Sequence, residues 1–155
     1  MDILNLGCGN KFVEPRAGAT IVNHDRTRHR PEVDVIWDLN ERPWPWADNS
    51  FDLLVACAVL EHLRLNLVES LAECWRILRP GGLLHLKLPY WQSDNSYMDP
   101  THYWHFSLQS LDLFDPDTVF GVRYTFYTPH KWKIVERPRL NDAKTSFAAK
   151  LRVRK

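Results

Sequence analysis

The stretch Ile3-Leu4-Asn5-Leu6-Gly7-Cys8-Gly9-Asn10 decides the fold of this chain. An apolar run stops abruptly at a Gly-x-Gly turn, and a second apolar run at 20–23 ends close to Asp25. In doubly wound α/β sheets, such glycines let the backbone approach a ligand, and an acid after the second strand accepts ribose hydroxyls. The two runs therefore predict a nucleotide-type pocket at the carboxyl ends of parallel strands.

Further strands and one clear helix follow along the chain. Apolar segments typical of buried strands lie at 33–37, 51–56 and 83–88. At 67–78, apolar residues recur every three to four positions, which indicates a helix with one buried face. Asn66 can cap its start, with Glu69 three residues later, and Pro80-Gly81-Gly82 ends it.

Strands that alternate with helices predict an α/β fold: a Rossmann-like, doubly wound, mostly parallel sheet in three αβα layers. Only about ten residues, including Pro15 and Gly18, join the first two strands. We therefore expect a loop or a single helical turn there in place of a full crossover helix. Near the end, 124–127 and 132–136 are typical of an antiparallel strand pair, and 107–114 of a short helix.

Size and composition describe one globular domain. We place it at residues 1–140 of the 155, followed by a basic tail at 141–155 that is disordered or packed on a partner. The formal net charge of +1 gives no general attraction to nucleic acid or membrane. From the sequence we expect neither a leader nor an apolar run of membrane-spanning length. Cys8, Cys57 and Cys74 lack metal-binding spacing and fit the reducing cytoplasm.

Three later segments carry a family resemblance: Asn49-Ser50-Phe51-Asp52, Val59-Leu60-Glu61-His62 and Arg76-Ile77-Leu78-Arg79-Pro80-Gly81-Gly82. Their order and separations, together with the Gly-x-Gly turn, resemble those of class I S-adenosylmethionine-dependent methyltransferases of the small type 11-like branch. The resemblance implies S-adenosylmethionine as the cofactor and methyl transfer as the activity. A nicotinamide-binding turn would need Gly-x-Gly-x-x-Gly, but Phe12 stands at the final position.

The resemblance also implies the cofactor contacts, which are Asn5, Gly7, Gly9, Asp25, Asp38, Leu39 and Ala56. In the family, the two glycines lie against the amino-acid part of the cofactor, and Asn5 stands where many members carry an acid. Asp25 would accept the ribose hydroxyls. Read without the family, the glycines form a simple turn and Asp25 caps one.

Two further segments complete the implied cofactor site. Asp38 and Leu39 match the family's adenine contact, although a surface-loop Asp explains Asp38 almost as well. Backbone at Ala56 or Ala58 would line the methionine end of the cofactor. The pair Glu61-His62 is expected to cap and brace the fold rather than to react.

The acceptor side is expected at Asp99-Pro100-Thr101-His102-Tyr103-Trp104-His105-Phe106-Ser107, which resembles a segment common in this branch. Methyl transfer requires an aligned acceptor and, for oxygen or nitrogen, removal of a proton. A histidine side chain can take up a proton near neutral pH, so His102 could be that base, with Asp99 orienting the acceptor. Alternatively, Asp99 forms a turn and His102 fixes the loop. Asp99, His102 and His105 could also bind a metal, but no fourth ligand is evident and we expect none.

The predicted function is S-adenosylmethionine-dependent methyl transfer to an oxygen or nitrogen acceptor. The alternative is an inactive module that keeps the fold and binds the cofactor or a partner. A small-molecule or glycan acceptor is favoured over nucleic acid because the net charge is close to zero. Because the sequence opens on the expected first strand, we do not expect the N-terminal helices that cover the cofactor in many relatives. A homodimer or a large acceptor is therefore expected to close the pocket.

Overall fold

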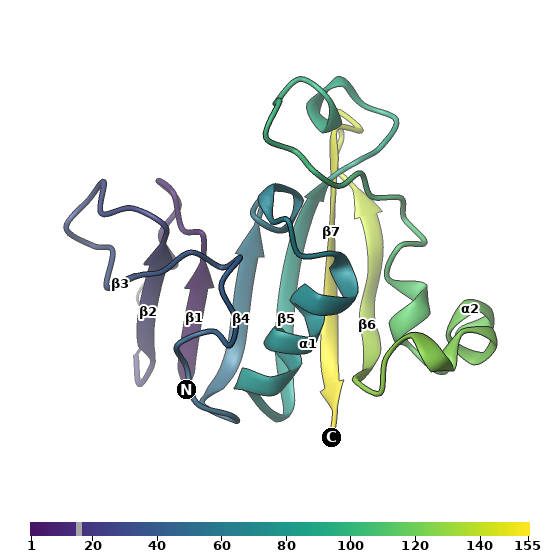
Figure 1. Ribbon diagram of the computed structural model, residues 1–155, viewed down its shortest axis with the longest axis horizontal. Coiled ribbons are helices and arrows are strands. Elements are labelled where there is room, and N and C mark those ends of the chain that lie inside the picture. The colour runs from purple at the N-terminus through teal and green to yellow at the C-terminus, as the bar shows by residue number, and fades with distance from the viewer. Residues whose placement is uncertain (15–16) are drawn as a thin grey trace.

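Seven strands form one mixed sheet in the order β3-β2-β1-β4-β5-β7-β6 (Figure 1). The structure, a computed structural model, describes residues 1–14 and 17–155. The strands are β1 (Asp2–Leu6), β2 (Thr20–Asp25), β3 (Val35–Ile36), β4 (Phe51–Cys57), β5 (Leu78–Pro89), β6 (Lys131–Leu140) and β7 (Ser146–Arg154). The first five are parallel, and β7 runs antiparallel to both of its neighbours. This confirms the Rossmann-like α/β fold with a C-terminal antiparallel pair.

The predicted helix is confirmed as α1 (Leu67–Ile77). The side chain of Asn66 accepts a hydrogen bond from the backbone N–H of Glu69, and the Glu69 carboxylate accepts one from the backbone N–H of Asn66. This reciprocal pair satisfies two of the N–H groups that a helix start leaves without partners. The other helices are α2 (Val119–Arg123) and the short 3-10 turns η1 (Leu60–His62), η2 (Asp94–Ser96), η3 (Asp112–Phe114) and η4 (Thr125–Tyr127). In place of the helix expected at 107–114, the structure has turns that end in η3.

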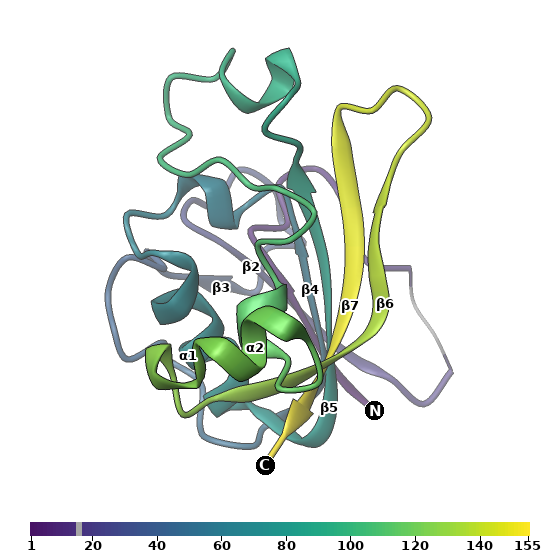
Figure 2. The same cartoon turned by 90° about the vertical axis from the view of Figure 1, so that its right-hand side faces the viewer.

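Both α-helices lie on one face of the sheet, as the edge-on view in Figure 2 shows. The connection between β1 and β2 runs on the opposite side, and its described residues contain no helix, as expected. Pro15, expected in this connection, lies outside the described residues. Among the described residues, therefore, the second helical layer expected from the αβα pattern is not present. A loop lies on that side instead.

The core lies between the sheet and the helices that cover one of its faces. Leu4, Leu54, Leu84 and Leu151 form one row across four neighbouring strands, and all four side chains are fully buried. In-register neighbours point to the same face of a sheet, so this row presents a continuous apolar surface. It belongs to the same buried cluster as the apolar face of α1. This packing holds the strands in place, and the expected site lies beyond their carboxyl ends.

The prediction of a basic tail at 141–155 is wrong, because residues 146–154 form β7 between β5 and β6. Its side chains alternate, with Phe147, Ala149, Leu151 and Val153 buried on the core face. The intervening positions carry the positive charges that made the segment look like a tail. The expected strand at 124–127 is also wrong, since that segment lies at η4 and the partner of β6 is β7.

In the described part of the chain, no helix is both long and apolar enough to cross a bilayer.

Candidate functional site

A cavity of about 550 Å³ lies beyond the carboxyl ends of β1, β2 and β4. These strand ends form the upper edge of the sheet in Figure 1. Five of the seven predicted cofactor residues line it, namely Gly7, Gly9, Asp25, Asp38 and Leu39. The volume suits a small molecule, and ligands of open α/β sheets bind at this edge. A cavity of about 680 Å³ also lies along β6 and β7, but none of the predicted site residues lines it.

The Gly-x-Gly turn is tied to the acid at the end of β2. The backbone N–H of Gly9 donates to Oδ2 of Asp25 at 2.9 Å, and Oδ1 of Asp25 accepts from the N–H of Arg26 at 2.7 Å. Both glycines adopt positive φ angles, +55° at Gly7 and +50° at Gly9, which favour glycine. The carboxylate therefore holds two turns together while it lines the cavity.

His24, the residue before Asp25, is a site residue that the sequence did not reveal. Its ring is buried, and Nδ1 accepts from the N–H of Gly7 at 3.3 Å, while Nε2 lies 3.0 Å from the carbonyl oxygen of Trp37. Because the carbonyl can only accept, Nε2 carries the proton and the ring is neutral. Burial lowers the pKa of His24, which agrees with this neutral form. The only sequence signal was a polar residue within an apolar run.

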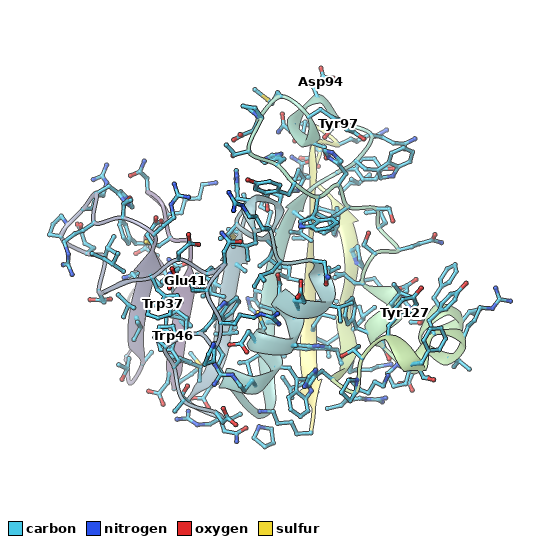
Figure 3. All side chains as sticks on the ribbon, viewed as in Figure 1. Trp37, Glu41, Trp46, Asp94, Tyr97 and Tyr127 are labelled. Atoms are coloured by element: carbon cyan, nitrogen blue, oxygen red, sulfur yellow. The ribbon has the colours of Figure 1, made fainter. Side chains whose placement is uncertain are left out.

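The adenine side of the predicted site is built by the turn after β3. Oδ1 of Asp38 accepts from the backbone and side-chain nitrogens of Asn40, both at 2.9 Å. Leu39 is buried, and its carbonyl accepts from the indole N–H of Trp44 at 2.9 Å. The turn thus presents one acid and one apolar wall to the cavity. Figure 3 labels Trp37 and Trp46, which lie in the segment around this turn.

Asn5 and Ala56 are not among the residues that line the cavity. Asn5 is buried, and its Nδ2 donates to the carbonyl of Lys11 at 2.9 Å and to Oδ1 of Asn23 at 3.1 Å. Its position in this structure is that of a brace for the turn. Ala56 is part of the buried core, and the first residues after β4 that line the cavity are Ala58 and Val59.

The predicted acceptor pair is brought together next to the cavity. Nε2 of His102 lies 3.9 Å from Oδ2 of Asp99, and its Nδ1 is 3.1 Å from the carbonyl oxygen of Ser96. Oδ1 of Asp99 accepts from the hydroxyl and the N–H of Thr101, which lower the pKa of Asp99. Thr101 lines the cavity, whereas His102 is not among the lining residues and has 9% of its side chain exposed.

Glu61 and His62, expected to brace the fold, stand beside this pair. The Glu61 carbonyl accepts from the N–H of Tyr103 at 2.8 Å, which joins η1 to the acceptor segment. Burial raises the pKa of the Glu61 carboxyl to about 7. The rings of His62 and His102 are 4.6 Å apart between centroids, and His62 lines the cavity.

His105 lies elsewhere in the acceptor segment. Its Nδ1 is 2.9 Å from the Ser96 hydroxyl, and its ring stacks on Tyr97, which Figure 3 labels near the top of the molecule. The predicted alternative metal set of Asp99, His102 and His105 is therefore not the group that the structure assembles. The group that it assembles contains Glu61, His62 and His102.

Fold and site together define a class of protein. A parallel sheet of this order with an antiparallel β7, a Gly-x-Gly turn bonded to the acid after β2, and a cavity at that edge define a class I S-adenosylmethionine-dependent methyltransferase. A family model described as "Methyltransferase domain" matches residues 4–86, which is more than half of the chain. The chain belongs to this family, in its type 11 branch. S-adenosylmethionine is the cofactor of the family.

Individual relatives agree with this assignment. A protein of Mycolicibacterium smegmatis described as "Probable S-adenosylmethionine-dependent methyltransferase" is 35% identical over 101 residues, which cover 57% of this chain and 38% of that protein. A solved methyltransferase from Archaeoglobus fulgidus superposes with a TM-score of 0.64 at 16% identity, over 97% of this chain and 85% of that one. One from Aquifex aeolicus gives 0.61 at 15% identity, over 99% and 82%. The two solved structures show the shared fold.

Proposed function

We propose that this chain binds S-adenosylmethionine in the 550 Å³ cavity and transfers its methyl group to an oxygen or nitrogen acceptor beside Thr101 and His102. The observation that carries this proposal is the bond from Gly9 N–H to Asp25, which places an open glycine backbone and a carboxylate side by side in the cavity wall. A ligand with ribose hydroxyls and an amino-acid part matches this pair of groups.

The glycine turn fits such a ligand. A Cβ atom at Gly9 would meet no atom within 4 Å, so the backbone there can be approached from the cavity. A Cβ at Gly7 would instead lie 2.4 Å from Cγ2 of Val59, so that glycine serves the packing of the turn on the segment between β4 and η1. Asp25 would hold the ribose, and Asp38 with Leu39 the adenine. When bound, the cofactor supplies a methyl group on a positively charged sulfonium, which neighbouring carboxylates favour.

On the acceptor side, His102 is the candidate base. The carbonyl of Ser96 holds its Nδ1–H, which leaves Nε2 with the free electron pair. Asp99 lies 3.9 Å from that nitrogen and would stabilise the imidazolium once Nε2 has taken up the acceptor's proton. In this role His102→Ala lowers turnover, whereas cofactor affinity stays unchanged because His102 is not among the residues lining the cavity. If the chain were an inactive module, neither the wild type nor His102→Ala would show turnover.

Calorimetric titration tests the cofactor site. Purified protein is titrated with S-adenosylmethionine and, separately, with S-adenosylhomocysteine. We expect micromolar binding, and a loss of tenfold or more, about 1.4 kcal/mol, in Asp25→Ala. The matched control is Asp142→Asn, an exposed acid between β6 and β7, which should bind like the wild type. The proposal is abandoned if neither compound binds to the wild-type protein.

The acceptor itself is proposed to be a small molecule or a glycan. The net charge of +1 supports this over nucleic acid, whose binding depends on many cationic contacts. A homodimer is supported by exposed apolar side chains on α2 and η4, where Val119, Val122 and Phe126 are 64–78% exposed. Light scattering at several protein concentrations tests the dimer. The cytoplasmic location stays a prediction.

A further inference from the structure

Two histidines and one glutamate meet at the wall of the cavity. Glu61 and His62 belong to η1, and His102 comes from the segment after β5. One ligand atom from each side chain lies within 4.8 Å of the other two. Around a tetrahedral ion with bonds of about 2 Å, ligand atoms are about 3.3 Å apart, so small side-chain rotations would close the set.

Both imidazole rings are already held in a tautomer that can bind a metal. The hydroxyl of Thr101 has one proton, and Oδ1 of Asp99 at 2.7 Å can only accept it. The oxygen of Thr101 therefore accepts from Nδ1–H of His62, at 2.8 Å. Nδ1–H of His102 likewise donates to the carbonyl of Ser96 at 3.1 Å. Each ring is left with a free electron pair on Nε2, and such outer hydrogen bonds are the usual supports of metal-binding histidines.

The carboxylate of Glu61 lacks what a buried acid needs. The residue is 1% exposed, and among the described residues its Oε2 has no hydrogen-bond partner. Burying a carboxylate without a partner is costly, and buried charges are normally paired or bound to metals. The orphaned oxygen and the two imidazole electron pairs thus point to a cation between them.

We propose that Glu61, His62 and His102 bind one divalent first-row transition-metal ion, such as Zn²⁺, Mn²⁺ or Co²⁺. Imidazole and carboxylate together suit these ions rather than Ca²⁺ or Mg²⁺, which prefer oxygen ligands. Oδ2 of Asp99, 3.9 Å from Nε2 of His102, is close enough to become a fourth ligand.

The ion has a place in the proposed reaction. His62 and Thr101 line the cavity, so coordination positions that the protein leaves open would face it. Those positions would take an oxygen of the acceptor, and this part of the inference rests on the proposed function. The role of His102 as a base therefore belongs to the metal-free site. With the ion bound, Nε2 of His102 is a ligand, and the ion would lower the pKa of a bound acceptor hydroxyl so that its proton passes to water. Metal binding itself does not depend on the proposed activity.

Metal titration of the full chain tests the site. The protein is stripped with EDTA, dialysed, and titrated with Co²⁺, followed by its visible ligand-field absorption, and with Zn²⁺ by calorimetry. We expect one ion per chain. Glu61→Gln, which keeps the side-chain volume, and His102→Ala should each weaken binding about 100-fold or more. Thr101→Val, which removes the partner of His62, should weaken it about 10- to 100-fold.

The matched control is His105→Ala, three residues from His102 in the same segment, which should bind like the wild type. Thermal unfolding without metal shows whether each variant is folded. If His102→Ala is not folded, the near-isosteric Glu61→Gln still tests the site. The proposal is overturned if the stripped protein binds no ion, or if Glu61→Gln binds as tightly as the wild type. S-adenosylmethionine titration of the same samples reports separately on the cofactor site.

Discussion

The ring of His24 joins the Gly-x-Gly turn to the turn after β3, because its Nδ1 accepts from the N–H of Gly7 at 3.3 Å. Its other nitrogen, Nε2, lies 3.0 Å from the carbonyl of Trp37. One neutral imidazole therefore bridges two of the loops that form the cofactor cavity. If the ring gained a second proton, at Nδ1, the new N–H would face the N–H of Gly7, and the hydrogen bond between them would be lost.

This bridge should make stability depend on pH. Burial lowers the pKa of His24 below its ordinary value of 6.5, so below that pH the unfolded chain binds more protons than the folded one. The contribution of His24 to the free energy of unfolding should therefore be greatest above about pH 6.5 and fall as pH decreases below it, with a slope approaching 1.4 kcal/mol per unit. The Glu61 carboxyl, whose pKa burial raises to about 7, acts in the opposite direction over the same range, so the effect of His24 is the difference in slope between the wild type and a His24 variant. Urea unfolding at about pH 7.5, 6.5 and 5.5 measures the slope.

The comparison variant is His24→Gln, which cannot titrate. Burial also lowers the pKa of His62 and His130, so part of the slope will remain in the variant. We expect a smaller slope in His24→Gln, together with a loss of about 1–3 kcal/mol at neutral pH from the disturbed hydrogen bonds. Equal slopes in the two proteins would show that His24 does not titrate as argued.

The two glycines of the turn should respond differently to alanine. Gly7→Ala combines a strained φ of +55° with a Cβ placed 2.4 Å from Cγ2 of Val59, and should cost about 2–5 kcal/mol of unfolding free energy. Gly9→Ala carries the strain without a clash, and should cost about 1–2 kcal/mol. Its larger effect should be on cofactor binding, since its Cβ projects into open space at the cavity. Denaturant unfolding and calorimetry separate the two effects, and similar costs at both positions would contradict this assignment.

Local signals in the sequence were enough to predict much of the fold and one side of the site. The capping pair of Asn66 and Glu69 and the Gly-x-Gly turn act over a few residues, so the sequence shows them directly. The cluster of Glu61, His62 and His102 could not be predicted, because it forms only when the segment after β5 folds back onto η1. The prediction of a second helical layer was wrong for a related reason. Strand alternation predicts a crossover between two strands without saying whether a helix or a loop makes it.

A partly buried ion-pair network fixes the loop before β4, and it should stabilise the fold more than a surface ion pair does. Arg76 donates to Oε2 of Glu73 at 2.8 Å and to the carbonyls of Trp44 and Trp46 at 3.0 and 2.8 Å. Oε2 of Glu73 also accepts from the N–H of Trp44 at 2.8 Å. Arg76→Ala leaves Glu73 without its cation in a half-buried place, and should cost about 2–3 kcal/mol.

The control pair is Arg42 and Glu69, which has the same 2.8 Å separation. Its two side chains are 41% and 35% exposed, against 24% and 12% for Arg76 and Glu73. Arg42→Ala should therefore cost about 0–1 kcal/mol. Urea unfolding of both variants, in low and high salt, measures the difference. Equal losses would mean that the loop contacts of Arg76 add nothing.

The placement of β7 inside the sheet gives the sharpest test of the fold. Leu151 is fully buried in the row that includes Leu84, and its neighbour Arg152 is exposed on the other face of the strand. Leu151→Ala removes a core side chain and should lower the free energy of unfolding by about 2–5 kcal/mol. Arg152→Ala should change it by no more than about 0.5 kcal/mol. If this segment were a basic tail, neither substitution would change the free energy of unfolding. A Leu151→Ala protein as stable as the wild type would therefore contradict the placement of β7 in the sheet. The alternation of large and small effects along 147–153 is the pattern that only a strand with one buried face produces.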